Sequence, residues 1–188
     1  MAKSWGGASA QLDARRRDTI KDGKRHATAM QTIYLGLGAN LGDRAANLRA
    51  AIKALAPQVA VLAESPLYET PAWGVEEQPG FLNMALKAET ELTPAALCEH
   101  VKRIERDLGR QPTYHWGPRL IDIDILLYED LIVDTPDLVI PHPQMHKRPF
   151  VLVPLETIAA DVVHPALGLS IRQLLAHVDT TGISAVPV

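Results

Sequence analysis

The chain has 188 residues, of which 47% are hydrophobic and 22% are charged, and its formal net charge is −3. These values are ordinary for a globular domain and exclude wholesale disorder, collagen and a disulfide scaffold. A single cysteine, Cys98, allows no internal disulfide, and no apolar run reaches the length of a transmembrane helix. We therefore expect a cytoplasmic protein without a membrane partner, and the overall charge does not suggest a nucleic-acid binder.

The charge is unevenly distributed along the chain. Residues 1–30 contain seven basic and three acidic residues, a net charge of +4, so the remainder carries −7. This segment also lacks the large apolar residues that form a helical or strand stripe. We predict a disordered basic N-terminal extension over 1–30 and a single folded domain over 31–188. A mitochondrial transit peptide and a nucleic-acid-binding arm are the alternatives for the extension.

The first half of the domain is expected to contain three strands and one helix. Residues 32–38 have strand composition, and residues 43–56 carry apolar residues near helical spacing with Asp43 as a candidate N-cap. Residues 59–68 predict a second strand, which Pro66 can break. A loop rich in proline and glycine over 70–80 then leads to a third strand over 81–90.

In the second half, Thr93 and Pro94 predict a helix start and Gly109 predicts its end. A polar loop over 110–118 precedes a strand over 120–128, a short hairpin over 131–133 and 138–140, and helices near 149–158 and 170–177. The order strand–helix–strand–strand–helix–strand is the ferredoxin-like pattern of the α+β class, which predicts an antiparallel-rich sheet with helices on one face. RNA-recognition modules share this order, so the fold alone does not decide the function.

The strongest local signal is the pair Asp122 and Asp124 inside an otherwise apolar strand. Side chains alternate along a strand, so both carboxylates project from one face and three isoleucines from the other. Two like charges so close are costly without a compensating cation, and hard oxygen ligands with no cysteine partner suit Mg²⁺. The alternative is a solvated sheet face on which each aspartate pairs with an arginine. Arg119 could be that partner, or it could grip a phosphate.

A basic loop follows the predicted hairpin and contains His142, His146, Lys147 and Arg148. Such side chains bind phosphate oxygens, although an ordinary basic surface loop would look the same. The sequence has no glycine-rich phosphate loop, so side chains would have to hold any nucleotide. Together with the aspartate pair, this loop indicates a metal–nucleoside triphosphate site.

Aromatic residues are scarce in the chain, yet Trp73 and Phe81 flank the 70–80 loop. An aromatic wall beside Asn83, whose amide both donates and accepts, suits a flat heteroaromatic ligand. The alternative is that Phe81 belongs to the core and that Trp73 covers the surface.

Six segments in this order resemble the 6-hydroxymethyl-7,8-dihydropterin pyrophosphokinase family over about residues 32–165. The segments are 38–42 (GANLG), 68–74 (YETPAWG), 78–83 (QPGFLN), 103–110 (RIERDLGR), 116–124 (WGPRLIDID) and 141–155 (PHPQMHKRPFVLVPL). One such motif is a weak signal, whereas six in register are specific.

The resemblance implies transfer of the β,γ-diphosphate of ATP to the hydroxymethyl pterin, giving AMP and the pterin diphosphate for folate biosynthesis. It implies that Asp122 and Asp124 hold two Mg²⁺ ions. It assigns the pterin pocket to Thr70, Pro71, Trp73, Phe81, Asn83 and Phe150. It assigns ATP binding to Arg110, Trp116, Arg119, Ile125, Leu138, Val139, His142 and Arg148, and catalysis to the two aspartates with Arg110, Arg119, His142 and Arg148.

The chain departs from the family pattern in two places. Residues 111–115 lack the extra basic residues often found in this loop, so Arg110 would have to supply most of its ATP contacts. Lys102 stands where some members have glutamine. We expect a monomer acting on small molecules. The rival functions are an RNA-recognition-type binding module and a different Mg²⁺-dependent nucleotidyl or sugar-nucleotide transferase.

Overall fold

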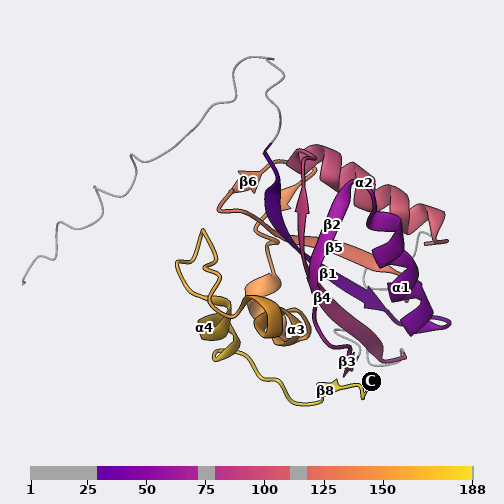
Figure 1. Ribbon diagram of the computed structural model, residues 1–188. Helices are drawn as coiled ribbons and strands as arrows, with labels where there is room; N and C mark the ends of the chain where they lie inside the picture. Colours follow the sequence, from indigo (N-terminus) through magenta and orange to yellow (C-terminus); the bar gives the residue numbers. More distant parts are fainter. Residues whose placement is uncertain (1–28, 72–78, 111–117, 188) are drawn as a thin grey trace, which may run out of the picture.

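The computed structural model describes residues 29–71, 79–110 and 118–187 (Figure 1). Most of the predicted N-terminal extension, Trp73, His115 and Trp116 lie outside these ranges. None of the helices within the described ranges is long and apolar enough to cross a membrane.

The first half of the domain follows the expected order. It consists of β1 (Gln31–Ala39), α1 (Arg44–Leu55), β2 (Val59–Glu64), β3 (Tyr68–Thr70) and β4 (Phe81–Thr90). The carboxylate of Asp43 accepts the Ala46 N–H at 2.9 Å, which confirms the predicted N-cap of α1. The expected strand over 59–68 does break around Pro66, and β2 and β3 both pair with β4.

The second half begins with α2 (Pro94–Asp107), which starts at the Thr93 cap and ends just before Gly109, where φ is +89°. It continues with β5 (Asp122–Tyr128), β6 (Val133–Asp134), β7 (Val139–Ile140), the 3₁₀ turn η1 (Met145–Lys147), α3 (Pro149–Ala159), α4 (Ile171–Leu175) and β8 (Ser184–Ala185). The hairpin β6–β7 is shorter than predicted, and η1 and β8 were not predicted from the sequence.

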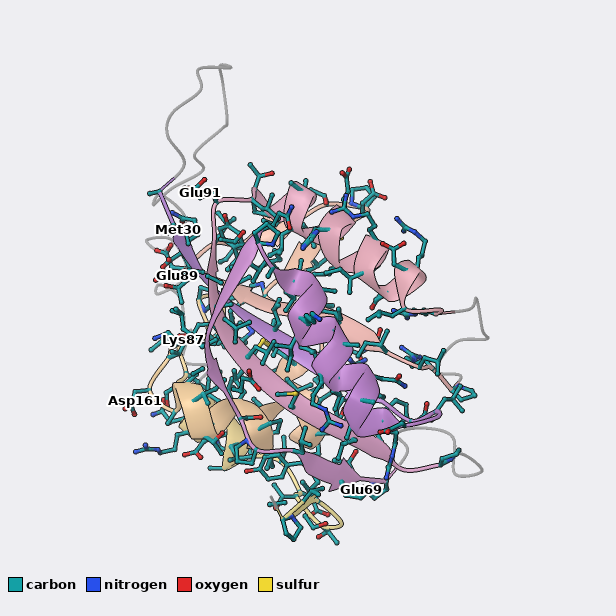
Figure 2. The ribbon with its side chains drawn as sticks, turned by 45° about the vertical axis from the view of Figure 1, so that its right-hand side comes forward. Met30, Glu69, Lys87, Glu89, Glu91 and Asp161 are labelled. Atoms are coloured by element: carbon teal, nitrogen blue, oxygen red, sulfur yellow. The ribbon has the colours of Figure 1, made fainter. Side chains whose placement is uncertain are left out.

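Six of the strands form one sheet in the order β5-β1-β4-β3-β8, with β2 also paired to β4, and β6 and β7 form a separate two-stranded sheet. Every pairing in the six-stranded sheet is antiparallel, which confirms the ferredoxin-like prediction. Figure 2 shows α1 and α2 lying over one face of the sheet. Their side of the core contains Ile33, Leu35, Leu37, Leu48, Leu97 and Val101.

The helices of the ferredoxin-like unit, α1 and α2, cover one face as expected. The two C-terminal helices, which the sequence also predicts, cover part of the opposite face: Leu152 and Leu155 of α3 and Leu174 of α4 bury a second cluster against it. Because they cover only part of their face, the sheet side chains next to them are left to line a pocket.

Candidate active site

Two glycines of β1 form the floor of this pocket. In the register of the sheet, Gly36 lies opposite Asp124 and Gly38 lies opposite Asp122 of β5, and Gly38 also pairs with Asn83 of β4. A Cβ added at Gly38 would lie only 2.7 Å from Oδ1 of Asn83. The glycines therefore leave open space between the carboxylates on one side and the amide on the other.

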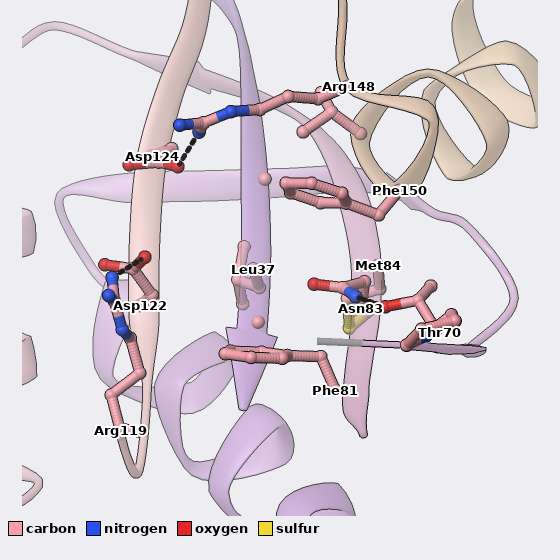
Figure 3. A pocket seen from close by; sticks show the side chains of 14 residues that line it. Leu37, Thr70, Phe81, Asn83, Met84, Arg119, Asp122, Asp124, Arg148 and Phe150 are labelled. Carbon is pink, nitrogen blue, oxygen red and sulfur yellow. Dashed lines mark hydrogen bonds and ion pairs between the residues drawn. The ribbon is translucent and has the colours of Figure 1, made fainter. Parts of the chain in front are cut away.

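A slot between two phenyl rings forms one end of the pocket. Figure 3 shows Phe81 of β4 and Phe150 of α3 on opposite sides of it, with Asn83 and Thr70 between them. The buried Asn83 donates from Nδ2 to Oγ1 of Thr70 at 2.7 Å, so its Oδ1 is directed toward the slot. The slot thus offers two aromatic faces and one oriented acceptor, which suits a flat ring with N–H groups at its edge.

The other end of the pocket carries the two aspartates of β5. Ile121, Ile123 and Ile125 pack into the core beneath the sheet, so Asp122 and Asp124 share the opposite face as the alternation predicts. Leu126 continues this alternation into the second core cluster, and the register shift between Tyr34 and Leu35 then places its neighbour Leu127 in the same cluster.

Asp122 is compensated by two arginines. Nη1 of Arg110 lies 2.7 Å from its Oδ1, and Nη1 of Arg119 lies 2.6 Å from its Oδ2. Burial acts to raise the pKa of Asp122, but the charges of Arg119 and Arg110 outweigh it and hold the pKa below its usual value. This aspartate therefore stays ionised at neutral pH.

Asp124 has weaker compensation. Among the described residues, its ion-pair partner is Nη1 of Arg148 at 3.9 Å from Oδ2, and Nε2 of His142 lies at the same distance. Burial, together with the neighbouring charge of Asp122, raises the pKa of Asp124 to about 7. Asp124 is therefore less directly compensated than Asp122, and a divalent cation would relieve the repulsion between the two carboxylates.

Arg148 links the slot to the carboxylates. Its guanidinium lies 5.6 Å from the ring centre of Phe150 and donates from Nη2 to Oε1 of Gln144 at 2.9 Å. Its buried Nε has no hydrogen-bond partner among the described residues. A buried N–H at this place is suited to an anion entering the pocket.

His142 is held neutral beside Arg148. Its backbone N–H donates to the Leu126 carbonyl at 3.0 Å, which attaches the basic loop to β5. Its Nδ1 accepts the Gln144 N–H at 3.2 Å, which favours the ring proton on Nε2, although Nη1 of Arg148 also lies 3.5 Å from that nitrogen. Burial and the charge of Arg148 lower the pKa of His142 to about 4.

Glu105 of α2 is a part of the site that sequence reasoning missed. Its buried carboxylate accepts the Ile123 N–H at 2.7 Å and pairs with Arg110 and with Lys102. It therefore holds both the start of β5 and the arginine that compensates Asp122. The available signal was an acidic residue on the apolar face of α2, directly after Ile104.

Three comparisons with known proteins identify the family. The model of the 7,8-dihydro-6-hydroxymethylpterin-pyrophosphokinase family matches residues 34–160. A 2-amino-4-hydroxy-6-hydroxymethyldihydropteridine pyrophosphokinase of Methylorubrum extorquens is 48% identical over 159 residues, 84% of this chain and 99% of that protein. The enzyme of the same name in Aquifex aeolicus is 46% identical over 136 residues, 72% of this chain and 85% of that protein.

The chain belongs to the hydroxymethyldihydropterin pyrophosphokinase family. It is therefore an enzyme of folate synthesis that transfers a pyrophosphoryl group from ATP to hydroxymethyldihydropterin. An HPPK-DHPS protein of Plasmodium falciparum shares the fold, with a TM-score of 0.66 at 16% identity over 81% of this chain and 46% of that one. The family decides against the two rival functions weighed from the sequence.

Most of the residues expected in the site lie in or beside one pocket. Its lining includes Thr70, Pro71, Phe81, Asn83, Arg119, Asp122, Asp124, Arg148 and Phe150, and Arg110 and His142 contact its carboxylates. Ile125 instead packs on the other face of β5, in the cluster that Leu138 also contacts, and Val139 is partly exposed nearby. Trp73 and Trp116 lie outside the described residues.

We expect Asp124→Asn to stabilise the protein when chelator is present and nucleotide is absent. The folded-state pKa of Asp124 lies above its unfolded value of about 4, so its charge destabilises the fold fully above pH 7 and not below pH 4. Removing that charge should raise the unfolding free energy at pH 8 by on the order of 1 kcal/mol, a gain of a few degrees in melting temperature.

The matched control is Asp122→Asn, which removes a carboxylate that two arginines compensate and should lower the melting temperature. Thermal melts at pH 4 and pH 8 measure both effects. A fall in melting temperature of the same size for both variants at pH 8 would refute this description of the charges.

We expect Glu105→Ala to be strongly destabilising, by about 3 kcal/mol, because it leaves the Ile123 N–H without its acceptor and removes one of the two carboxylates that pair with Arg110. Glu105→Gln keeps an acceptor and should lose less. Lys102→Ala removes only the half-exposed partner and should change the urea midpoint little. Equal losses for Glu105→Ala and Lys102→Ala in urea denaturation would contradict this order.

Proposed function

We propose that the pocket between the phenyl slot and the β5 carboxylates is the active site for pyrophosphoryl transfer. The observation that carries the proposal is that a flat aromatic slot and a paired carboxylate site line one cavity, joined by Arg148. A ring that enters the slot with a hydroxymethyl arm on its inner side would direct the hydroxyl toward the carboxylates. Such positioning is the main catalytic contribution expected for phosphoryl transfer.

In this proposal the pterin stacks between Phe81 and Phe150. Oδ1 of Asn83 accepts from the N–H groups of the pterin edge, while Thr70 holds the amide in that orientation. Pro71 lines the same wall, and Trp73 is included on the sequence resemblance alone. The buried Asn83 would lose its partner with any ligand that lacks those donors, which gives the slot selectivity.

Asp122 and Asp124 would hold two Mg²⁺ ions in this proposal. The described residues include no group of three or more His, Cys, Asp or Glu side chains that could enclose a metal on its own. The remaining ligands would therefore be phosphate oxygens and water, as is usual for Mg²⁺ with one or two carboxylates. When bound, Mg²⁺ supplies charge neutralisation on the phosphates and polarises the phosphorus under attack.

The cationic residues would bind the rest of the triphosphate. Arg110, Arg119 and Arg148 stabilise negative charge as AMP leaves, and His142 offers its Nε2–H to a phosphate oxygen. The hydroxyl oxygen attacks the β-phosphorus, and the bond from that phosphorus to the oxygen shared with the α-phosphate breaks. The electron pair leaves with AMP, and the hydroxyl proton is released.

We place the nucleoside at the free edge of β5 in this proposal, because α1 and α2 cover the other face of the sheet. Leu138 and Val139 lie near this edge, the resemblance adds Ile125 and Trp116, and Ile125 itself is buried in the core. We also propose that the enzyme acts as a monomer in the cytoplasm, without nucleic acid or a membrane.

We expect Asp122→Asn and Asp124→Asn each to lower AMP formation from ATP and the hydroxymethyl pterin by about 100-fold or more at saturating Mg²⁺. Both variants remove a charge that would bind the metal. The control is Asp161→Asn, which changes a 91% exposed side chain just after α3 and should keep full activity. Product chromatography measures AMP directly. Wild-type turnover in both β5 variants would end the metal assignment.

We expect Asn83→Ala to weaken pterin binding by about tenfold to 100-fold and to leave ATP binding unchanged. Calorimetry with each ligand separately distinguishes the two effects. As a control, Thr70→Val removes only the partner that orients the amide, and its effect should be smaller. Equal weakening of both ligands by Asn83→Ala would contradict the assignment of the slot to the pterin.

A further inference from the structure

The C-terminal arm, residues 176–187, runs from α4 to the far edge of the sheet and ends beside β3 (Figure 1). Its strand β8 pairs antiparallel with β3, with Tyr68 opposite Ala185 and Glu69 opposite Ser184. The Val186 N–H also donates to the Leu67 carbonyl at 2.8 Å. The family model ends at residue 160, so this arm lies beyond the matched region.

The strand that the arm covers carries one wall of the slot. β3 has only three residues, and Thr70, its last, orients Asn83 through the 2.7 Å hydrogen bond. Pro71 follows directly and lines the slot. A strand this short has few pairing groups of its own, so its position depends on β4 on one side and on β8 on the other.

The arm also touches Pro71 directly. Gly182 has φ of +82°, and a Cβ added there would lie 3.0 Å from Cγ and 3.4 Å from Cδ of Pro71. Pro71 also borders a second groove, which Thr181 and Ile183 of the arm line together with Thr70 and Phe150. The Pro71 ring is therefore held between the slot and the backbone of the arm.

We propose that the C-terminal arm is a positioning element for the pterin: Gly182 and β8 fix Pro71 and Thr70, and so set the width of the slot. This inference rests on the proposed assignment of the slot to the pterin. The carboxylates lie on β5, at the opposite end of the strand order from β8. Changes in the arm should therefore alter pterin affinity and leave ATP affinity and kcat in place.

Gly182→Ala tests the contact, with Gly168→Ala as the matched control. Both glycines have positive φ, +82° and +69°, so alanine costs backbone strain at both, but a Cβ at Gly168 meets nothing within 4 Å. Gly182→Ala should shift Pro71 by a few tenths of an ångström and raise the pterin KM about fivefold. Gly168→Ala should lower the melting temperature comparably and leave the pterin KM unchanged. Both variants should retain the wild-type ATP KM and kcat.

A second pair of variants tests the strand pairing. Val186→Pro removes the N–H that donates to Leu67, whereas Val186→Ala keeps it. The proline variant should raise the pterin KM and the alanine variant should not, again with the ATP KM unchanged. This pair gives a result even if alanine at Gly182 prevents folding.

The inference is overturned if Gly182→Ala and Gly168→Ala have the same pterin KM, or if the pterin and ATP constants rise together. Asn83→Ala is assayed in parallel to separate this failure from that of the proposed pocket. If Asn83→Ala weakens pterin binding while neither arm variant does, only the role of the arm is wrong. If Asn83→Ala leaves pterin binding intact, the slot assignment itself fails and the arm inference fails with it.

Discussion

The repulsion between two carboxylates on one face of β5 is the constraint on which the site depends. Asp122 is balanced by Arg110 and Arg119, whereas Arg148, the arginine that pairs with Asp124 among the described residues, lies 3.9 Å away. The cost of the repulsion therefore falls mainly on Asp124, and a bound cation would relieve it. Glu105 adds a further buried acid that fixes Arg110, so the arrangement of charges is set by the core rather than by flexible surface side chains.

The glycines of β1 keep the space beside these carboxylates open. A side chain at Gly38 would collide with Asn83, and one at Gly36 would contact Leu126, so any larger residue would fill the floor between the two halves of the site. Glycine weakens a strand interior, yet here it lies in the middle of a sheet with partners on both sides. The buried leucines and isoleucine of β1, which alternate with the glycines, compensate by packing under α1 and α2.

The features that could be predicted from the sequence are those set by local periodicity and by helix caps. The alternation in β5 placed both aspartates on one face, and the caps at Asp43 and Thr93 fixed both helix starts. Local periodicity does not predict contacts between segments that are distant in the sequence. Glu105 accepts the N–H of Ile123, 18 residues later, and β8 pairs with β3 although most of the domain separates them in the sequence. The resemblance assigned Ile125 to ATP binding and its neighbour Asp124 to the metal, and the strand places these two side chains on opposite faces.

The two halves of the site are held by different kinds of interaction, and this difference bears on how they can vary. The charged half is fixed by the ion pairs of Arg110 with Asp122 and with Glu105 of α2. A substitution there is therefore expected to change stability and activity together. The aromatic half is closed by a three-residue strand at the edge of the sheet and by an arm outside the family match. Because β3 and β8 lie at the opposite end of the strand order from β5, the proposed pterin slot can change its fit while the charged half keeps its geometry.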